Sequence, residues 1–82
     1  MTDQELLAHI VINREVMTGK PIIKGTRLTV EFILNLLAHG ATTDDVLAEY
    51  PGLTRDDIRA CLLFATKALE RTDFLPLSGE AA

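Results

Sequence analysis

The residues of this sequence with the most reactive side chains are two histidines, one cysteine and one serine. His9, His39 and Cys61 are too scattered to form the C-x-x-C or H-x-x-x-H spacing of metal ligands, and Ser78 is the only serine. Each has a simpler place in a strand, a helix end, a core or the last segment. We therefore expect no metal site, no cofactor and no catalytic nucleophile.

Two pairs of neighbouring acids, Asp44/Asp45 and Asp56/Asp57, could in principle form a general acid–base dyad. Each pair, however, falls in the expected first turn of a helix, where carboxylates stabilise free backbone amides and the positive end of the helix dipole. We interpret both pairs as helix caps. The protein is accordingly expected not to be an enzyme, and a small hydrolase lacks a supporting set of residues.

A basic string, GKPIIKGTR, occupies positions 19–27 and superficially resembles a phosphate-binding loop. The Walker motif requires a Gly-Lys pair after a four-residue spacer and directly before Ser or Thr, whereas here the pair comes first and Pro21 follows it. What remains is a loop-rich segment that displays Lys20, Lys24 and Arg27. These three side chains could contact DNA phosphates or an acidic groove of another protein.

A second set of cations stands at the expected start of the last helix. In a helix-turn-helix, the first turn of the second helix enters the major groove, and here it would carry Arg55 and Arg59. A guanidinium can bind guanine through two hydrogen bonds, whereas the nearby Asp56 and Asp57 would repel phosphates. The alternative is that Arg59 only pairs with one of these acids on a wet surface.

A short β-hairpin is predicted ahead of these helices. Residues 9–12 and 21–24 are rich in apolar, β-branched side chains and are separated by a loop that contains Gly19. Pro21 donates no amide hydrogen bond and so belongs at a strand start, and Gly25 is expected to have a positive φ. Residues 1–8 are too few to decide between a helical turn and a frayed end.

Three helices follow, each preceded by a threonine suited to capping the first turn. Glu31 stands in the first turn of the first helix, and Gly40 and the Pro51–Gly52 pair are suited to ending the first and second helices. The expected helices run from Thr29 to near His39, from Thr42 to Tyr50 and from Thr54 to about Arg71. The fold class is thus mainly α, a three-helix helix-turn-helix core with a short N-terminal β-hairpin.

The last helix has more apolar surface than one buried stripe requires. Its stripe is predicted to comprise Ile58, Cys61, Leu62, Ala65 and Leu69. Leu63 and Phe64 fall outside that stripe and are expected to contact a partner, with a homodimer seam as one candidate.

Residues 1–71 are expected to form a single domain, followed by a flexible tail, 72–82. The helical period is lost in the tail at Pro76 and Gly79. Phe74, Leu75 and Leu77 could anchor the tail on a partner protein, or they could pack back onto the domain.

Charge and composition restrict the binding partners. The chain of 82 residues has a net charge of -4, so any DNA contact must be local. Residues 14–27 carry a net +3 and residues 31–53 a net -4, either as functional surfaces or by chance clustering on a solvated face. A lone buried cysteine and the lack of a long apolar run predict a cytoplasmic protein without a membrane span.

From His9 to about Ala65 the sequence resembles the domain of unknown function 433 family, which is grouped with VapB-like antitoxins. The resemblance rests on G-K-P-x-I-x-G-T-R at 19–27, on the helix that ends at Gly40, and on Y-P-x-L-T with paired acids at 50–57. It implies a winged-helix-like or homeodomain-like fold. Family members are commonly encoded beside a PIN-like ribonuclease toxin, which they are taken to neutralise while they bind the DNA of their own operon.

Two hypotheses about function remain open at this point. In the first, the protein is an antitoxin that neutralises a PIN-like toxin and binds operator DNA, reading bases with Arg55 and Arg59. Lys20, Lys24 and Arg27 would then hold backbone phosphates. In the second, the protein is an interaction module that has the shape of a helix-turn-helix but never touches DNA.

Overall fold

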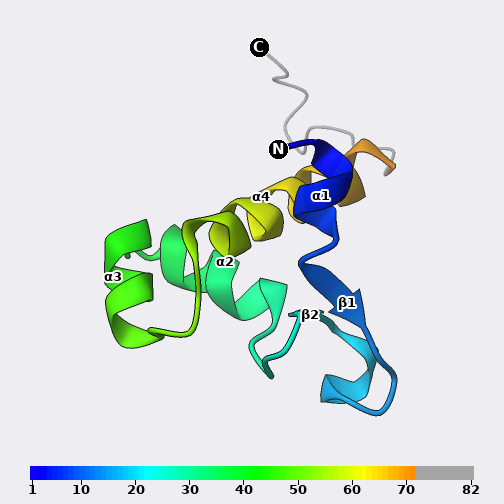
Figure 1. Cartoon of the computed structure of the whole chain (residues 1–82), viewed down its shortest axis with the longest axis horizontal. Helices are drawn as coiled ribbons and strands as arrows, with labels where there is room; N and C mark the ends of the chain where they lie inside the picture. The colour runs from blue at the N-terminus through cyan, green and yellow to red at the C-terminus, as the bar shows by residue number, and fades with distance from the viewer. Residues whose placement is uncertain (72–82) are drawn as a thin grey trace, which may run out of the picture.

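Residues 1–71 are described by the computed structural model, and they form four α-helices and one two-stranded antiparallel sheet. The elements are α1 (Asp3–Leu7), β1 (Ile10–Ile12), a 3₁₀ turn (Met17–Gly19), β2 (Pro21–Ile23), α2 (Val30–Ala38), α3 (Thr43–Glu49) and α4 (Arg55–Glu70). α4 lies across the molecule and packs against α1, α2, α3 and β1 (Figure 1). The mainly helical fold with an N-terminal hairpin is therefore confirmed.

The predicted hairpin is present, with Val11 opposite Ile22 and Ile12 opposite Pro21. β-branched side chains favour this extended, pleated backbone, and the proline stands at the start of its strand as expected. Gly25 has the predicted positive φ, 81°. The second edge of β2 is covered by the chain that returns at Leu28, whose carbonyl accepts a hydrogen bond of 3.0 Å from the Ile23 N–H.

Each of the three predicted helices begins at its predicted cap. The Thr29 hydroxyl accepts a hydrogen bond from the Phe32 N–H at 2.9 Å, while Thr42 and Thr54 form reciprocal capping boxes with the acid three residues later. A third capping box, formed by Thr2 and Glu5, begins α1, the helix that the sequence left undecided. Such caps satisfy amides that have no partner within the helix.

The core is aliphatic and lies between α2, α3, α4 and β2. Its buried members are Ile23, Val30, Ile33, Val46, Leu53, Ile58 and Cys61. Because the chain has few aromatic residues, branched aliphatic side chains supply nearly all of the buried apolar surface.

The predicted stripe of α4 is wrong at two positions. Leu62 and Leu69 are 48% and 62% exposed, whereas Phe64 packs against the core. The buried side of α4 is turned toward Phe64 because α1 and β1 pack against the same helix. The packing of α1 and β1 on α4 was not predicted from the sequence, so the wrong side of α4 was predicted to be buried.

Candidate binding surfaces

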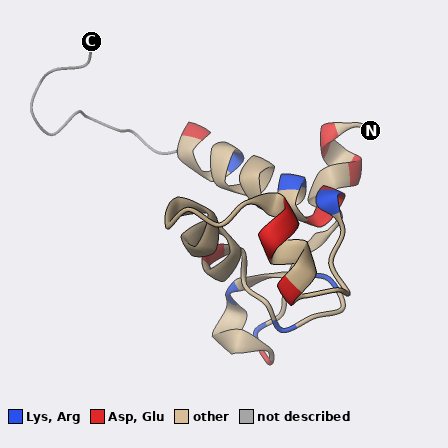
Figure 2. Cartoon of the chain, turned by 90° about the vertical axis from the view of Figure 1, so that its left-hand side faces the viewer, with Lys and Arg blue, Asp and Glu red and all other residues tan. Residues whose placement is uncertain are grey.

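The tip formed by α3 and the start of α4 is acidic, and the two arginines predicted to read DNA lie within it. The exposed acids of α3 are Asp44, Asp45 and Glu49. In Figure 2, α3 faces the viewer and carries acidic segments at both ends and no basic one. The surface that a helix-turn-helix would turn toward DNA therefore has the same sign of charge as the phosphates.

Both arginines at this tip have acidic partners. Arg55 forms an ion pair with Asp44 of α3, and Arg59 lies 3.4 Å from Asp56, one turn earlier in α4. All four side chains are at least partly exposed, so each pair contributes little to stability. The ion pairs instead disfavour binding of these arginines to DNA bases, because each guanidinium must first give up its carboxylate partner.

The cations predicted on the hairpin are divided between two places. Lys20 reaches across to α2, where its ammonium lies 3.1 Å from Glu31. Lys24 instead lines a shallow pocket near the start of α4, together with His9 and Asp57. Lys24 and Arg27 are exposed and form no ion pair within residues 1–71. They are the predicted cations that remain open to an external anion.

A polar contact between two distant parts of the chain was not predicted from the sequence. The His9 Nδ1 atom lies 2.7 Å from Asp57 Oδ1, which joins the start of β1 to the first turn of α4. Asp57 also accepts the capping bond of 2.9 Å from the Thr54 N–H. Partial burial by itself raises the pKa of Asp57, but the bonds from His9 and Thr54 outweigh burial and lower the pKa. No local pattern links two residues 48 positions apart.

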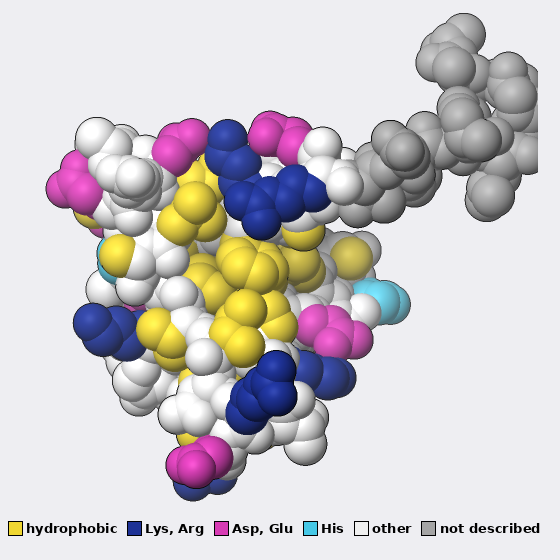
Figure 3. All heavy atoms as spheres, turned by 90° about the vertical axis from the view of Figure 1, so that its right-hand side faces the viewer, with side chains coloured by type: hydrophobic (Ala, Val, Ile, Leu, Met, Phe, Trp, Pro, Cys, Tyr) yellow, Lys and Arg dark blue, Asp and Glu magenta, His cyan; other side chains and the backbone are white. Residues whose placement is uncertain are grey.

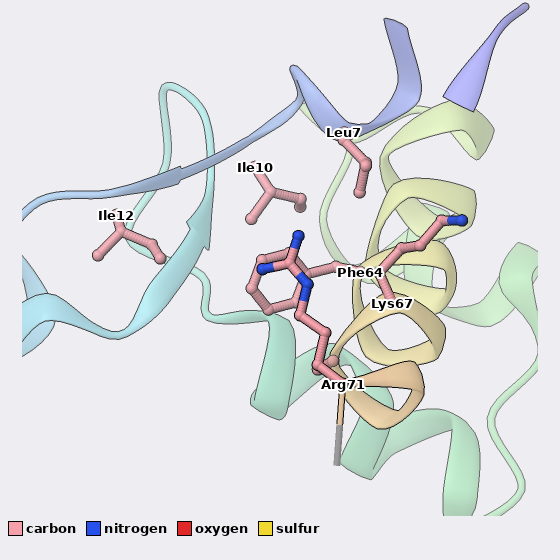
Figure 4. Close-up of a pocket in the computed structure, with 7 residues that line it drawn as sticks. Leu7, Ile10, Ile12, Phe64, Lys67 and Arg71 are labelled. Atoms are coloured by element: carbon pink, nitrogen blue, oxygen red, sulfur yellow. The ribbon is translucent and has the colours of Figure 1, made fainter. Parts of the chain in front are cut away.

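An apolar groove with a volume of about 500 Å³ lies between α1, β1 and the C-terminal half of α4. Figure 3 shows apolar side chains gathered on this face with basic side chains at its edges. In Figure 4, Leu7 and Ile10 point from α1 and β1 toward α4. The lining residues are Leu7, Ile10, Ile12, Phe64 and Ala68, with Lys67 and Arg71 as its two cations.

The predicted partner-binding residues are distributed as follows. Phe64 lines the groove while it also packs on the core, and Leu63 is half-buried beside it in α4. The predicted anchors Phe74, Leu75 and Leu77 lie outside the described residues. The sequence predicted an apolar surface on α4 but not the groove itself. One wall of the groove is formed by α1 and β1, whose position beside α4 was not predicted.

The thiol of Cys61 is inaccessible. Burial, and secondarily the Asp57 carboxylate, raises the pKa of Cys61 to about 11. The thiol is consequently protonated at neutral pH, which makes it a poor nucleophile and a poor metal ligand. Within residues 1–71, no three His, Cys, Asp or Glu side chains are grouped closely enough to hold a metal ion.

A family model described as "Protein of unknown function (DUF433)" matches residues 10–65, which contain the hairpin, α2, α3 and most of α4. The chain belongs to this DUF433 family. A DUF433 member protein from Anabaena variabilis, known from a crystal structure, is similar to this chain with 32% sequence identity and a TM-score of 0.73. The match covers 83% of this chain and 67% of that protein.

The search of curated proteins found no match to this DUF433 chain. None of the helices within residues 1–71 has the length and apolar character needed to cross a membrane.

Proposed function

We propose that this DUF433 protein is a non-catalytic binding protein and serves as the antitoxin of a toxin–antitoxin pair, with a PIN-like ribonuclease as its partner. The observation that supports this most directly is the acidic surface of α3 and the first turn of α4, which carries Asp44, Asp45, Glu49 and Asp56. A ribonuclease presents positive charge to its RNA substrate. An acidic surface is complementary to such a cleft, accelerates the encounter and competes with RNA.

The order of α2, α3, a short break and α4 matches the layout of a helix-turn-helix. We propose that these helices bind the toxin protein rather than DNA. The reason is electrostatic: Arg55 and Arg59 each have a carboxylate partner, and the surrounding acids repel phosphates. The shape alone does not decide the ligand, because the same fold supports unrelated functions.

Co-expression with the product of the adjacent reading frame tests the proposal. We expect the tagged chain to retain that product through purification, and we expect Glu49→Lys to weaken the complex. Glu15→Lys is a matched control, because Glu15 is also an exposed glutamate but stands in the hairpin loop. A soluble, folded neighbour that is not retained contradicts the proposal, as does an equal effect of the two substitutions.

A second function, binding of operator DNA, is favoured by the hairpin cations. Lys24 and Arg27 have no acidic partner within residues 1–71, and the segment 14–27 carries a net charge of +3. DNA contact through this segment would position the protein through phosphates rather than read bases. The hairpin, rather than the start of α4, would then face the duplex.

Fluorescence anisotropy with the duplex upstream of the gene, measured over a range of salt concentrations, tests this second function. Each lost phosphate contact should reduce the slope of log K against log salt by about 0.9, so the double variant Lys24→Ala/Arg27→Ala should reduce it by about 2. Arg55→Ala/Arg59→Ala is the comparison variant. If only this comparison variant loses affinity, α4 rather than the hairpin contacts DNA, and if the wild type does not bind at low salt, the DNA role is excluded.

A further inference from the structure

The edge of β1 that faces away from β2 is open. β2 is covered on both sides, by β1 and by the chain at Leu28–Thr29, but no strand of residues 1–71 lies beyond β1. β1 has the sequence Ile-Val-Ile, without the lysine, proline or inward charge that usually protects an edge strand from pairing with another chain.

The hydrogen-bond register identifies which groups of β1 are unpaired. The Lys24 N–H donates to the His9 carbonyl at 2.7 Å, so this carbonyl points toward the second strand. Because direction alternates along a strand, the main-chain groups of Val11 point the same way, and those of Ile10 and Ile12 point outward. The hydrogen bonds found within residues 1–71 provide no partner for these outward groups.

The side chains at this edge border the apolar groove. Ile10 and Ile12 both line it, with Leu7 and Phe64 beyond them (Figure 4). Ile12 is 61% exposed, a large unfavourable apolar surface for a strand residue. The unpaired backbone groups and the unfilled groove are therefore adjacent features of one face.

We infer that this face binds a second copy of the chain, through antiparallel pairing of the two β1 strands about a two-fold axis at Val11. Ile10 of each protomer then stands opposite the partner's Ile12, and their outward N–H and C=O groups form four hydrogen bonds. A two-fold interface requires this reciprocity, in which residue i meets j and j meets i. The unpaired N–H and C=O groups belong to Ile10 and Ile12, the two residues that face each other across such an axis.

The same pairing covers the groove. Residues opposite each other in an antiparallel pair have their side chains on the same face of the sheet. The partner's Ile12 consequently lies beside Ile10 at the mouth of the groove and is itself removed from water. Two ribbons become one four-stranded sheet, with an α4 helix packed against each of its two central β1 strands.

The charges around β1 also favour the antiparallel arrangement. Asp3 and Glu5 precede the strand in α1, and the first residue with a positive charge after the strand is Arg14. Antiparallel pairing places the start of one β1 next to the end of the other. Arg14 of each protomer thus approaches the acidic helix of its partner. This interface does not depend on the proposed antitoxin function.

Light scattering coupled to size exclusion tests the inference on the full-length chain. We expect a mass twice that of the 9.0 kDa chain, and we expect Ile12→Lys to give a folded monomer, since Ile12 is mostly exposed in the single protomer. Leu69→Lys is the control, because Leu69 is equally exposed but lies on the far side of α4 from Phe64. A monomeric wild type, or a dimer that survives Ile12→Lys, overturns the inference.

Cross-linking tests the register. Val11→Cys places two thiols opposite each other at the axis, within the distance that a disulfide spans, so oxidation should give a covalent dimer. Asn13→Cys is a matched control, because its counterpart stands about four residues away along the paired strands, roughly 13 Å. Equal cross-linking at both positions overturns the proposed register. A chain truncated after Arg71 should remain dimeric. If it becomes a monomer, residues 72–82 rather than the β1 strands make the contact between the protomers.

Discussion

Three carboxylates of this protein occupy the same position within their helices. Glu5, Asp45 and Asp57 are each the third residue of a helix, and each accepts a hydrogen bond from the backbone N–H of its cap residue. The backbone bond from Thr2, and then its hydroxyl, lowers the pKa of Glu5, and Thr42 lowers the pKa of Asp45 in the same way. The ionised forms of these side chains are thus coupled to the folded state.

This coupling predicts a pH dependence of stability. A carboxyl with a lowered folded pKa stabilises the fold fully above its unfolded pKa of about 4, and this contribution is lost as the pH falls through the folded value. The melting temperature should therefore be nearly constant from neutral pH to about pH 5 and should fall below about pH 4. Thermal melting followed by circular dichroism over this range is the measurement.

The variant Asp57→Asn identifies the contribution of the most buried of the three carboxylates. It should destabilise the protein at neutral pH, because it removes the charge that binds His9, and it should also flatten the pH dependence. A variant that melts with the wild-type pH profile would assign the acid sensitivity to other carboxylates.

The buried thiol gives a second prediction at this scale. Since burial raises the pKa of Cys61 to about 11, iodoacetamide should not modify the native protein at pH 8, whereas it should modify the protein rapidly in urea. Mass spectrometry of samples quenched over time measures both rates. Rapid modification without denaturant would mean that α4 opens locally far more often than its packing implies.

At the scale of elements, the helix boundaries could be predicted because their causes are local. Thr29, Thr42 and Thr54 all cap the helices that they were predicted to begin, since a cap involves only residues two or three apart. The side of a helix that is buried depends on what packs there. Phe64 was expected at a partner surface and packs on the core, because α1 and β1 are neighbours that its own sequence context does not reveal.

Two glycines that follow helices differ in backbone conformation, and this difference can be tested by substitution. Gly40, which follows α2, has a φ of 101°, whereas Gly52 has no positive φ, and an added Cβ would meet nothing within 4 Å at either position. Gly40→Ala should therefore lower the free energy of unfolding by about 1–2 kcal/mol through backbone strain alone. Gly52→Ala should change it by less than about 1 kcal/mol, in the stabilising direction. Urea denaturation measures both, and equal effects would contradict the assigned conformations.

At the scale of the whole molecule, several charged side chains form pairs that join different elements of the fold. The alternation of a basic segment and an acidic segment along the chain was visible, but the partners of individual charges were not. Arg55 meets Asp44 from a preceding helix, and Lys20 meets Glu31 across a turn. These pairings arise from tertiary packing. They shift the DNA-contact proposal from the start of α4 to Lys24 and Arg27.

The proposed pairing of two β1 strands also has a consequence for stability. If the protein unfolds from a dimer to two separate chains, mass action makes its melting temperature depend on protein concentration. A tenfold increase in concentration then adds about 1.4 kcal/mol per dimer, or about 0.7 kcal/mol per chain. For a domain of this size that amounts to a rise of about 3–5 °C in the melting temperature.

Differential scanning calorimetry at three concentrations measures this dependence, with Ile12→Lys as the variant that should lose it. The variant should melt at one temperature throughout, because an exposed lysine at the edge of β1 leaves each protomer folded but unpaired. Leu69→Lys should keep the wild-type slope. A wild type whose melting temperature is independent of concentration would mean that the domain reaches its full stability alone, so the open edge and the groove would then be available to a different partner.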